Sequence, residues 1–501
     1  MKLSFLAVLL MLQTVSRAGP TLDLKELGAR GDGQNNDSAA FRAAADIIQK
    51  AGGGHLIIPR GTYIVGEQLH EDGKFPYYKS QPIFSVKNVD GLIIEGRGAT
   101  IRMASGLRFG SFDKLTGEPI QPKPGGFTDR AYAVSVGSMF VINDSRNIQI
   151  RNLELDGNSS TFVLGGYWGD VGWQLGACGI RMYQNINVVV ENVHTHHHGL
   201  DGILLGWTGL KETDAPTPHT LINVVSEYNA RQGLSWVGGR GLRVYRSKFN
   251  HTARGAFGSA PRAGLDIEAE DSICRDGYFE DCEFINNVGP AMVADSGDGG
   301  YTRFVRCVFW GVSNWSTWSR KPGLVYEDCK IYGTAVHGYG STNALLATRY
   351  VRCHFEDKDY GTNGVYRVNS VIECALSGNN ITYEDCTIIA NKTRSIWFDN
   401  GTEQKFVRGC TFIHRHQRAD NDFVALFRGA HIENTRFEED YPIGTTNRFR
   451  IETQKVIVGT NVVVTGPCVR WNGRTGLIQA TKPADSSHLN KTNELQQLVA
   501  P

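Results

Sequence analysis

Apolar and polar residues alternate around a short phrase that recurs between residues 277 and 357. The four copies are YFEDCEF, RFVRCVF, VYEDCKI and RYVRCHF, and they carry Cys282, Cys307, Cys329 and Cys353. These cysteines are 25, 22 and 24 residues apart, and aromatic and β-branched residues surround them. Alternation over so short a run predicts a strand with one buried face. A repeat of this length with strands in each unit predicts a solenoid.

Related phrases, most with another residue in the cysteine position, extend the pattern in both directions. They are centred on Leu153, Val193, Val225, Ser247, Cys386, Cys410 and Thr435. No run with the helical period of 3.6 accompanies them, so the units stack as parallel strands about 4.8 Å apart. The pattern predicts an all-β fold, a single parallel β-helix of about eleven coils. Cysteines at one position of successive coils form an inward ladder of small apolar groups, and their pairing in disulfides is left open.

Before the repeats, the sequence predicts a helix over Ala39–Gln49 that is capped by Asp37 or Ser38. Glycines 52 to 54 end it, and a strand over His55–Ile58 follows. A helix at this place covers the open end of the solenoid. The predicted segments are a signal peptide (1–18), an N-terminal cap with the first coil (19–65), the β-helix (66–480) and a flexible tail (481–501).

The first residues have the pattern of a secretory signal. Lys2 precedes an apolar run from Leu3 to Leu12, and small residues lead to a cleavage site after Ala18. We therefore expect a secreted or periplasmic protein. No later segment has the roughly 18 apolar residues of a membrane span. A net charge of +1, with scattered Lys and Arg, predicts no nucleic-acid partner.

The opening of the mature chain resembles a known family. GARGDG, a capped helix, GGG, a strand and PRGTY are similar to the start of the pectate-lyase-like family of secreted right-handed parallel β-helix proteins. That family includes polysaccharide lyases, polygalacturonase-type glycosidases, mannuronan epimerases and phage tailspikes. The resemblance spans roughly residues 21–480 and implies a right-handed β-helix with a polysaccharide partner, but it does not specify the reaction.

Insertions between the phrases indicate where a site would lie, because a solenoid accepts extra residues only in its loops. The spacing grows to 40 residues between Leu153 and Val193, and residues 156–300 form the most decorated region. We expect its aromatic and histidine side chains to contact sugar rings, unless the rings only cover the insertions. The candidate binding residues here are Arg181, His197, His198, Trp207, Arg231, Trp236, Arg262 and Glu270.

The strongest acidic cluster lies in the sequence AGLDIEAED. If Leu265, Ile267 and Ala269 point inward on one strand, Asp266, Glu268 and Glu270 point outward. Outward neighbours on a strand are about 7 Å apart, near the separation of the acid and base in an inverting glycosidase. Crowding of like charges also raises one pKa and creates a proton donor. A solvated acidic edge or a cation site is the alternative.

Asp201, in HHHGLDGILLG, is the other catalytic candidate. We expect it two coils before Asp266 and three positions away along the strand. Its LDG looks like the Asp-Gly-hydrophobic element of polygalacturonases and mannuronan epimerases. The chain departs from both families elsewhere: it has Arg231 and Gln232 where polygalacturonases have paired Asp, and Arg262-Ala263-Gly264 where they have Gly-His-Gly. It also has Ala177–Met182 where the epimerases have Tyr-Gly-Phe-Asp-Pro-His.

We predict no metal site at the three consecutive histidines, because adjacent residues on a strand point in opposite directions. The main hypothesis is a glycosidase without cofactor, with Asp266 or Glu268 as the acid and the partner carboxylate or Asp201 as the base. The second is a lyase or epimerase acting on a uronate polymer. It would use Arg181, Arg231 or Arg262, or Ca²⁺ on the acidic cluster. The third is a glycan-binding solenoid without activity. Outward carboxylates outnumber plausible bases, which favours the first.

Overall fold

The computed structural model describes residues 19–70, 78–113, 115–120, 132–166, 175–311, 315–333, 336–358, 370–373, 379–391, 393, 395–398, 405–415, 423–440, 449–454, 457–465, 469–472 and 479–480. The predicted signal peptide, the predicted tail, Trp168 and Trp173 lie outside the described residues. Within them, no helix is long and apolar enough to cross a membrane.

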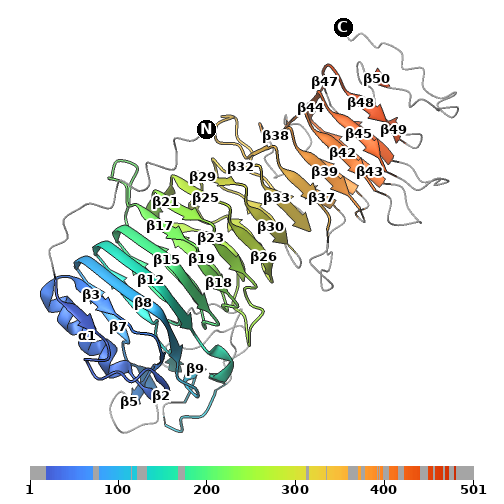
Figure 1. Cartoon of the computed structure of the whole chain (residues 1–501). Coiled ribbons are helices and arrows are strands. Elements are labelled where there is room, and N and C mark those ends of the chain that lie inside the picture. Colours follow the sequence, from blue (N-terminus) through green and yellow to red (C-terminus); the bar gives the residue numbers. More distant parts are fainter. Residues whose placement is uncertain are drawn as a thin grey trace.

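Parallel strands stack along one axis in the described part of the chain (Figure 1), which confirms the all-β parallel β-helix. The largest sheet has 28 strands. In it, β8 (Asp90–Met103), β12 (Arg146–Asp156) and β15 (Ile186–His196) pair in parallel in this order. On its other side, β15 pairs in parallel with two shorter strands, β17 (His219–Ile222) and β18 (Val225–Glu227). The register places Thr100 beside Glu154 and Glu154 beside His194.

A second sheet of nine strands holds Asp201 and Asp266, whereas Glu270 lies on β24 (Ala269–Arg275) of a separate three-stranded sheet. Its strands are β7 (Phe84–Lys87), β11 (Phe140–Asn143), β14 (Ile180–Tyr183), β16 (Asp201–Gly206), β19 (Gln232–Val237), β23 (Ala263–Ile267), β27 (Met292–Ala294), β31 (Thr317–Ser319) and β34 (Val336–His337). Each pairs in parallel with the equivalent strand of the next coil. Because coils are in register, one outer row runs through Arg181, Leu204, Ser235, Asp266, Val293, Trp318 and His337.

Each recurring phrase forms two short strands rather than one, which corrects the sequence prediction. In the first copy, β25 (Gly277–Glu280) ends before Asp281, and β26 (Glu283–Asn287) begins after Cys282. Asp281 has φ 55°, and Arg306, Asp328 and Arg352 occupy the same left-handed position in the next coils. This residue bends the coil, since a left-handed residue ends the extended backbone.

The predicted inward ladder is present. The eight described cysteines are free, buried thiols. Those of the phrases donate weak hydrogen bonds to carbonyls of the preceding coil, as Cys307 does to Phe279 at 3.5 Å. Phe279, Phe304 and Tyr326 stack next to them with ring centroids 5.0 to 5.1 Å apart.

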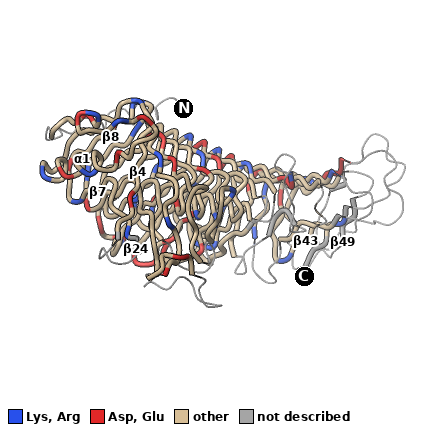
Figure 2. Tube along the Cα trace, turned by 90° about the horizontal axis from the view of Figure 1, so that it is seen from below, with Lys and Arg blue, Asp and Glu red and all other residues tan. Residues whose placement is uncertain are grey.

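On the outer surface of the coils, acidic and basic residues are interspersed (Figure 2). Arg306, for example, pairs with Asp281 of the previous coil at 2.8 Å.

The predicted helix is α1 (Ser38–Ala51), at the N-terminal end of the stack in Figure 1. It buries Phe41 and Ile48, among others, and ends at Gly52, whose φ is 76°. Asp37 occupies the N-cap position, but its side chain makes no cap hydrogen bond. Instead, its carboxylate accepts hydrogen bonds from the backbone N–H groups of Arg30 (2.7 Å) and Gly31 (3.1 Å). The residue therefore holds the GARGDG turn rather than the helix end.

Candidate functional site

The acidic segment of residues 263–271 is divided between two strands. β23 ends at Ile267 and β24 (Ala269–Arg275) begins after Glu268. Leu265, Ile267 and Ala269 are fully buried, as the alternation predicted, so Asp266 and Glu268 face the other side. Their exposure rises along the chain: Asp266 is 4% exposed, Glu268 is half-buried and Glu270 is exposed. The predicted single acidic strand is thus a graded row from interior to solvent.

Burial gives Asp266 the most perturbed carboxyl in this row. It raises the pKa of Asp266 well above its usual range, and the charge of Glu268 adds to the effect. The carboxyl oxygen Oδ2 is hydrogen-bonded to the Gln232 side chain, one coil earlier. The donor is the amide nitrogen Nε2, and the amide oxygen Oε1 is buried without a partner. Since the two ends of an amide are assigned from hydrogen bonds, a protonated Asp266 that donates to Oε1 satisfies both groups.

Glu268 is the member of the row that combines a shifted pKa with access to solvent. Burial and the charge of Glu270 raise the pKa of its carboxyl, while a hydrogen bond with Ser296 opposes the shift. A carboxylate with a raised pKa is a stronger base near neutral pH than an ordinary one. Glu268 is therefore the best placed acid or base in this row.

Asp201 and Arg231 form a buried ion pair. Arg231 donates from Nε to Asp201 Oδ1 at 2.7 Å and from Nη2 to Oδ2, and Ser235 donates to Oδ2 at 2.9 Å. Asp201 is 0% exposed and Arg231 is 4% exposed. The register puts Asp201 beside Gln232 and level with Ala263, so the predicted offset of three positions from Asp266 is confirmed. Asp201 contacts Arg231 rather than solvent, which argues against a direct role as base.

The predicted binding residues differ in how far their side chains are exposed. Trp236 is 2% exposed and His198 is 2% exposed, so neither is placed on the surface to contact a sugar. Trp236 points inward because it alternates with the outward Ser235. Burial lowers the pKa of His198 to about 3, and its Nε2 lies 3.2 Å from the carbonyl of Leu155.

Three others remain partly accessible. The Arg181 guanidinium lies 4.7 Å from the centre of the Tyr183 ring. Trp207 is half-buried directly after β16, and Arg262 is half-buried with φ 61° on the turn before β23. Arg181 shares the outer row with Asp266, whereas Arg262 is on the coil of Asp266 itself.

The sequence prediction missed an aromatic cluster on the same outer row. Trp318 lies two coils beyond Asp266, after Val293. Its ring centroid is 4.7 Å from that of Trp315 and 4.2 Å from that of His337, and all three side chains are half-buried. The motif WSTWS carried the signal, since two Trp within four positions of one coil are unusual in a chain with 9 Trp.

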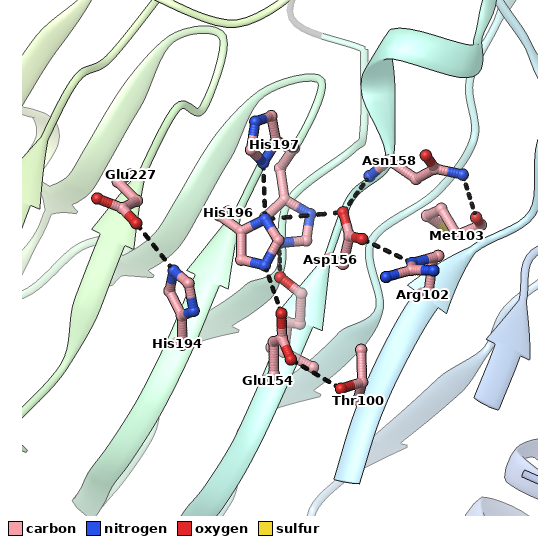
Figure 3. A network of polar contacts seen from close by, with 12 residues as sticks. Thr100, Arg102, Met103, Glu154, Asp156, Asn158, His194, His196, His197 and Glu227 are labelled. Carbon is pink, nitrogen blue, oxygen red and sulfur yellow. Dashed lines mark hydrogen bonds and ion pairs between the residues drawn. The ribbon is translucent and has the colours of Figure 1, made fainter. Parts of the chain in front are cut away.

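The sequence prediction assumed that adjacent histidines point in opposite directions, and the structure contradicts this for His196 and His197. His197 has φ 54°, and this left-handed conformation turns its ring toward that of His196 (Figure 3). Two groups of ligand atoms within 4.8 Å of one another result: Glu154 with His194 and His196, and Asp156 with His196 and His197. Among the described residues, Asp266, Glu268 and Glu270 form no such group. Glu154 and Asp156 were missed by the sequence prediction, although LELD aligns with VHTH in the repeat, which puts Glu154 beside His194 and Asp156 beside His196.

A shallow groove of about 350 Å³ adjoins this cluster. Asn152, Asn192 and Asn223, which occupy the left-handed bend of three successive coils, line it together with Glu154 and His194. The side-chain amides hydrogen-bond from coil to coil, with Asn192 donating to Asn152 at 3.0 Å. The groove is thus on the large sheet, away from the acidic row of the nine-stranded sheet.

Comparison with known proteins gives distant relatives. No protein-family model matches the sequence. Alginate lyase 7 of Azotobacter vinelandii is 26% identical over 226 residues, 43% of this chain and 23% of that protein. Mannuronan C5-epimerase AlgE6 of the same organism is 28% identical over 235 residues, also 43% and 23%. The epimerase AlgE3 is 27% identical over 282 residues, 52% of this chain and 13% of that protein.

The matched part of the chain therefore spans less than a third of these relatives. Among solved structures, the A-module of mannuronan C-5 epimerase AlgE4 of Azotobacter vinelandii covers 93% of this chain and all of that module, with 15% identity and a TM-score of 0.43. The tailspike protein gp49 of Pseudomonas phage LKA1 has 11% identity and a TM-score of 0.43, with 88% of this chain and 81% of that chain covered. At these scores the likenesses add nothing to the strand pairing described above.

These relatives support the broader resemblance to β-helix proteins that act on polysaccharides. Its pectate-lyase and polygalacturonase branches are not confirmed. The matched relatives are named for lyase and epimerase activity, which favours the second functional hypothesis over the glycosidase.

Proposed function

We propose that this protein is an enzyme that modifies a uronate-containing polysaccharide by lyase or epimerase chemistry at C5 of the sugar. The observation that supports this most is the sequence similarity to alginate lyase 7 and to mannuronan C5-epimerases, over 36% to 52% of the chain. We propose the outer face of β16, β19 and β23 as the active site, because the outward carboxyls with raised pKa lie there.

Glu268 is the proposed base. It accepts the C5 proton, and the electron pair left at C5 is delocalised into the uronate carboxyl group. In a lyase, this electron pair then forms the C4–C5 double bond while the C4–O bond breaks and the leaving oxygen takes up a proton. In an epimerase, a proton returns to C5 from the opposite face. Both reactions share the first step, so one base serves either outcome.

Asp266 acts as a positioning residue in this proposal. It lies behind Glu268 and is 4% exposed. Its raised pKa favours its neutral form, so it adds less negative charge beside an anionic polymer than an ordinary aspartate would. The charge of Asp201 is likewise compensated by Arg231. The face consequently repels a uronate far less than its number of carboxyl groups would indicate.

The aromatic cluster of Trp315, Trp318 and His337 is the proposed sugar platform. Trp318 is two coils from Asp266, about 10 Å along the axis, which is near the length of two sugar units. Aromatic rings stack on the apolar face of a sugar. A polymer that crosses the coils parallel to the axis would thus contact the rings and Glu268 together.

The test is incubation of the purified protein with alginate, pectate and neutral polysaccharides in D₂O. Ultraviolet absorbance detects the unsaturated product of a lyase, and NMR detects deuterium that enters at C5 in an epimerase. We expect one of these signals on a uronate polymer, its loss in Glu268→Gln, and its retention in the exposed neighbour control Glu270→Asp, which keeps the charge next to Glu268. New reducing ends with neither signal would show a glycosidase and contradict the proposal.

A further inference from the structure

Asp156, His196 and His197 form a compact set of ligand atoms that the proposed reaction does not use. His196 Nδ1 lies 2.7 Å from His197 Nδ1 and 3.7 Å from Asp156 Oδ1. Consecutive histidines converge here because His197 is left-handed, with φ 54°. His196 comes from the last position of β15 and Asp156 from the last position of β12, directly beside it (Figure 3).

The outer groups around this set resemble the support of a metal centre. The second nitrogen of His196, Nε2, lies 2.9 Å from Glu154 Oε1. Asp156 accepts hydrogen bonds from Arg102 Nε at 2.7 Å and from the backbone N–H of Asn158 at 2.9 Å. A histidine that binds a metal commonly donates its other N–H to a carboxylate, and a ligating carboxylate is itself hydrogen-bonded.

The ring of His197 is held in place from its other side. It stacks on Tyr228 with ring centroids 5.1 Å apart and planes 7° apart. Tyr228 stacks in turn on His251, with centroids 4.9 Å apart. A ring fixed by stacking keeps its nitrogen aimed at His196, which is the preorganisation that a binding site requires.

The tautomer of His196 determines what can lie between the two rings. With Glu154 as acceptor, His196 carries its proton on Nε2 and presents a lone pair from Nδ1. A second nitrogen 2.7 Å away must then share either a proton or a cation with it. Two imidazole nitrogens and one carboxylate oxygen are a typical donor set for zinc and its neighbours.

We propose that Asp156, His196 and His197 bind a divalent transition-metal ion, zinc being the ion that this donor set suits. Zinc about 2.1 Å from each nitrogen sets two ligand atoms about 3.0–3.4 Å apart. To bind zinc, the Nδ1 atoms of His196 and His197, now 2.7 Å apart, need to separate by a fraction of an ångström. The distance of 3.7 Å between His196 Nδ1 and Asp156 Oδ1 is already near the required value. Asp156 and His196 are 9% exposed, so the ion would lie largely under the surface.

A neighbouring set of Glu154, His194 and His196 competes for the same histidine. It would use His196 Nε2 and would require Glu154 as a ligand. His194 is less well prepared, because its side chain is 41% exposed and its Nε2 lies 3.1 Å from Glu227. The two arrangements differ in their dependence on His194 and His197, and this difference defines the experiment.

The experiment uses the full chain, freed of metal with a chelator and titrated with Zn²⁺ by calorimetry and with Co²⁺ by visible spectroscopy. The test variants are Asp156→Asn and His197→Asn, since asparagine tolerates the left-handed backbone. The matched control is His194→Asn. We expect one ion per chain in the wild type and in the control, and binding at least about 100-fold weaker in both test variants.

Glu154→Gln provides a test that leaves all three ligands in place. We expect it to weaken Zn²⁺ binding by about 10–100-fold, as loss of an outer carboxylate does elsewhere. Thermal melting of each metal-free variant shows whether it is folded. Wild-type protein without saturable binding of one ion would overturn the proposal, and so would a His194→Asn variant that loses the ion while His197→Asn keeps it.

Discussion

Replacement of Asp266 by asparagine tests whether the raised pKa of this carboxyl affects the stability of the protein. The folded protein favours the neutral form of this carboxyl, because burial and the charge of Glu268 raise its pKa well above the value of 3.8 that it would have in an unfolded chain. Asparagine has the shape of a neutral aspartic acid and retains a hydrogen-bonding group for Gln232. We therefore expect Asp266→Asn to keep the native structure and to become the more stable protein as the pH rises.

The magnitude follows from proton linkage. Above pH 3.8 the unfolded chain releases this proton while the folded chain keeps it. The unfolded state then binds fewer protons, so rising pH favours unfolding of the wild type. The free-energy difference between variant and wild type grows by about 1.4 kcal/mol per pH unit. The growth stops once the pH passes the folded-state pKa.

The assay is urea unfolding of both proteins at several pH values from 4 to 8. Asp266→Ala is the control, since it removes the same titration but also the hydrogen bond to Gln232. We expect its pH dependence to follow that of Asp266→Asn, with an overall stability lower by about 1–3 kcal/mol for the unpaired amide. Wild-type and Asp266→Asn curves that stay parallel over this range would refute the assignment of a neutral Asp266.

Two further predictions concern the packing that holds the site. Asp201→Asn leaves the guanidinium of Arg231 buried without its counter-charge, and we expect a loss of about 3–5 kcal/mol in the free energy of unfolding, measured with urea; a loss under 1 kcal/mol would show that the pair is not buried in solution. Gly202→Ala places a Cβ 1.9 Å from Ser226 Oγ and should cost about 1–3 kcal/mol or more by the same measurement. Gly176→Ala, whose nearest contact is at 3.4 Å, should change stability by less than about 0.5 kcal/mol.

The features that the sequence predicted correctly depend on short-range periodicity. Alternation along one strand determines that Leu265 and Ile267 are buried while Asp266 faces outward. The coil length then determines which residues are neighbours on adjacent coils, so the offset between Asp201 and Asp266 was also predictable. Both inferences need only the spacing of apolar residues and no knowledge of the loops.

The features that it predicted wrongly depend on single backbone angles and on partners far along the chain. Asp281 divides its phrase into two strands, and His197 turns its ring toward His196, because each residue is left-handed. Strand alternation assumes an extended backbone at every position and fails at such a residue. Arg231 was expected to face substrate, but its partner Asp201 is 30 residues earlier. Only the register shows that they meet.

The two functional hypotheses also differ in how they depend on the environment of the carboxyl groups. The glycosidase hypothesis rested on the number of outward carboxyl groups, which exceeded the number of plausible bases. In the structure Asp201 is paired with Arg231, and burial raises the pKa of Asp266, which favours its neutral form. Glu268 is then the carboxyl of this face that combines a raised pKa with access to solvent. A glycosidase needs two carboxyl groups in contact with the substrate, whereas a lyase or epimerase needs one base and a proton donor that does not have to be a carboxyl group. The burial of two of the three catalytic candidates thus points the same way as the relatives do.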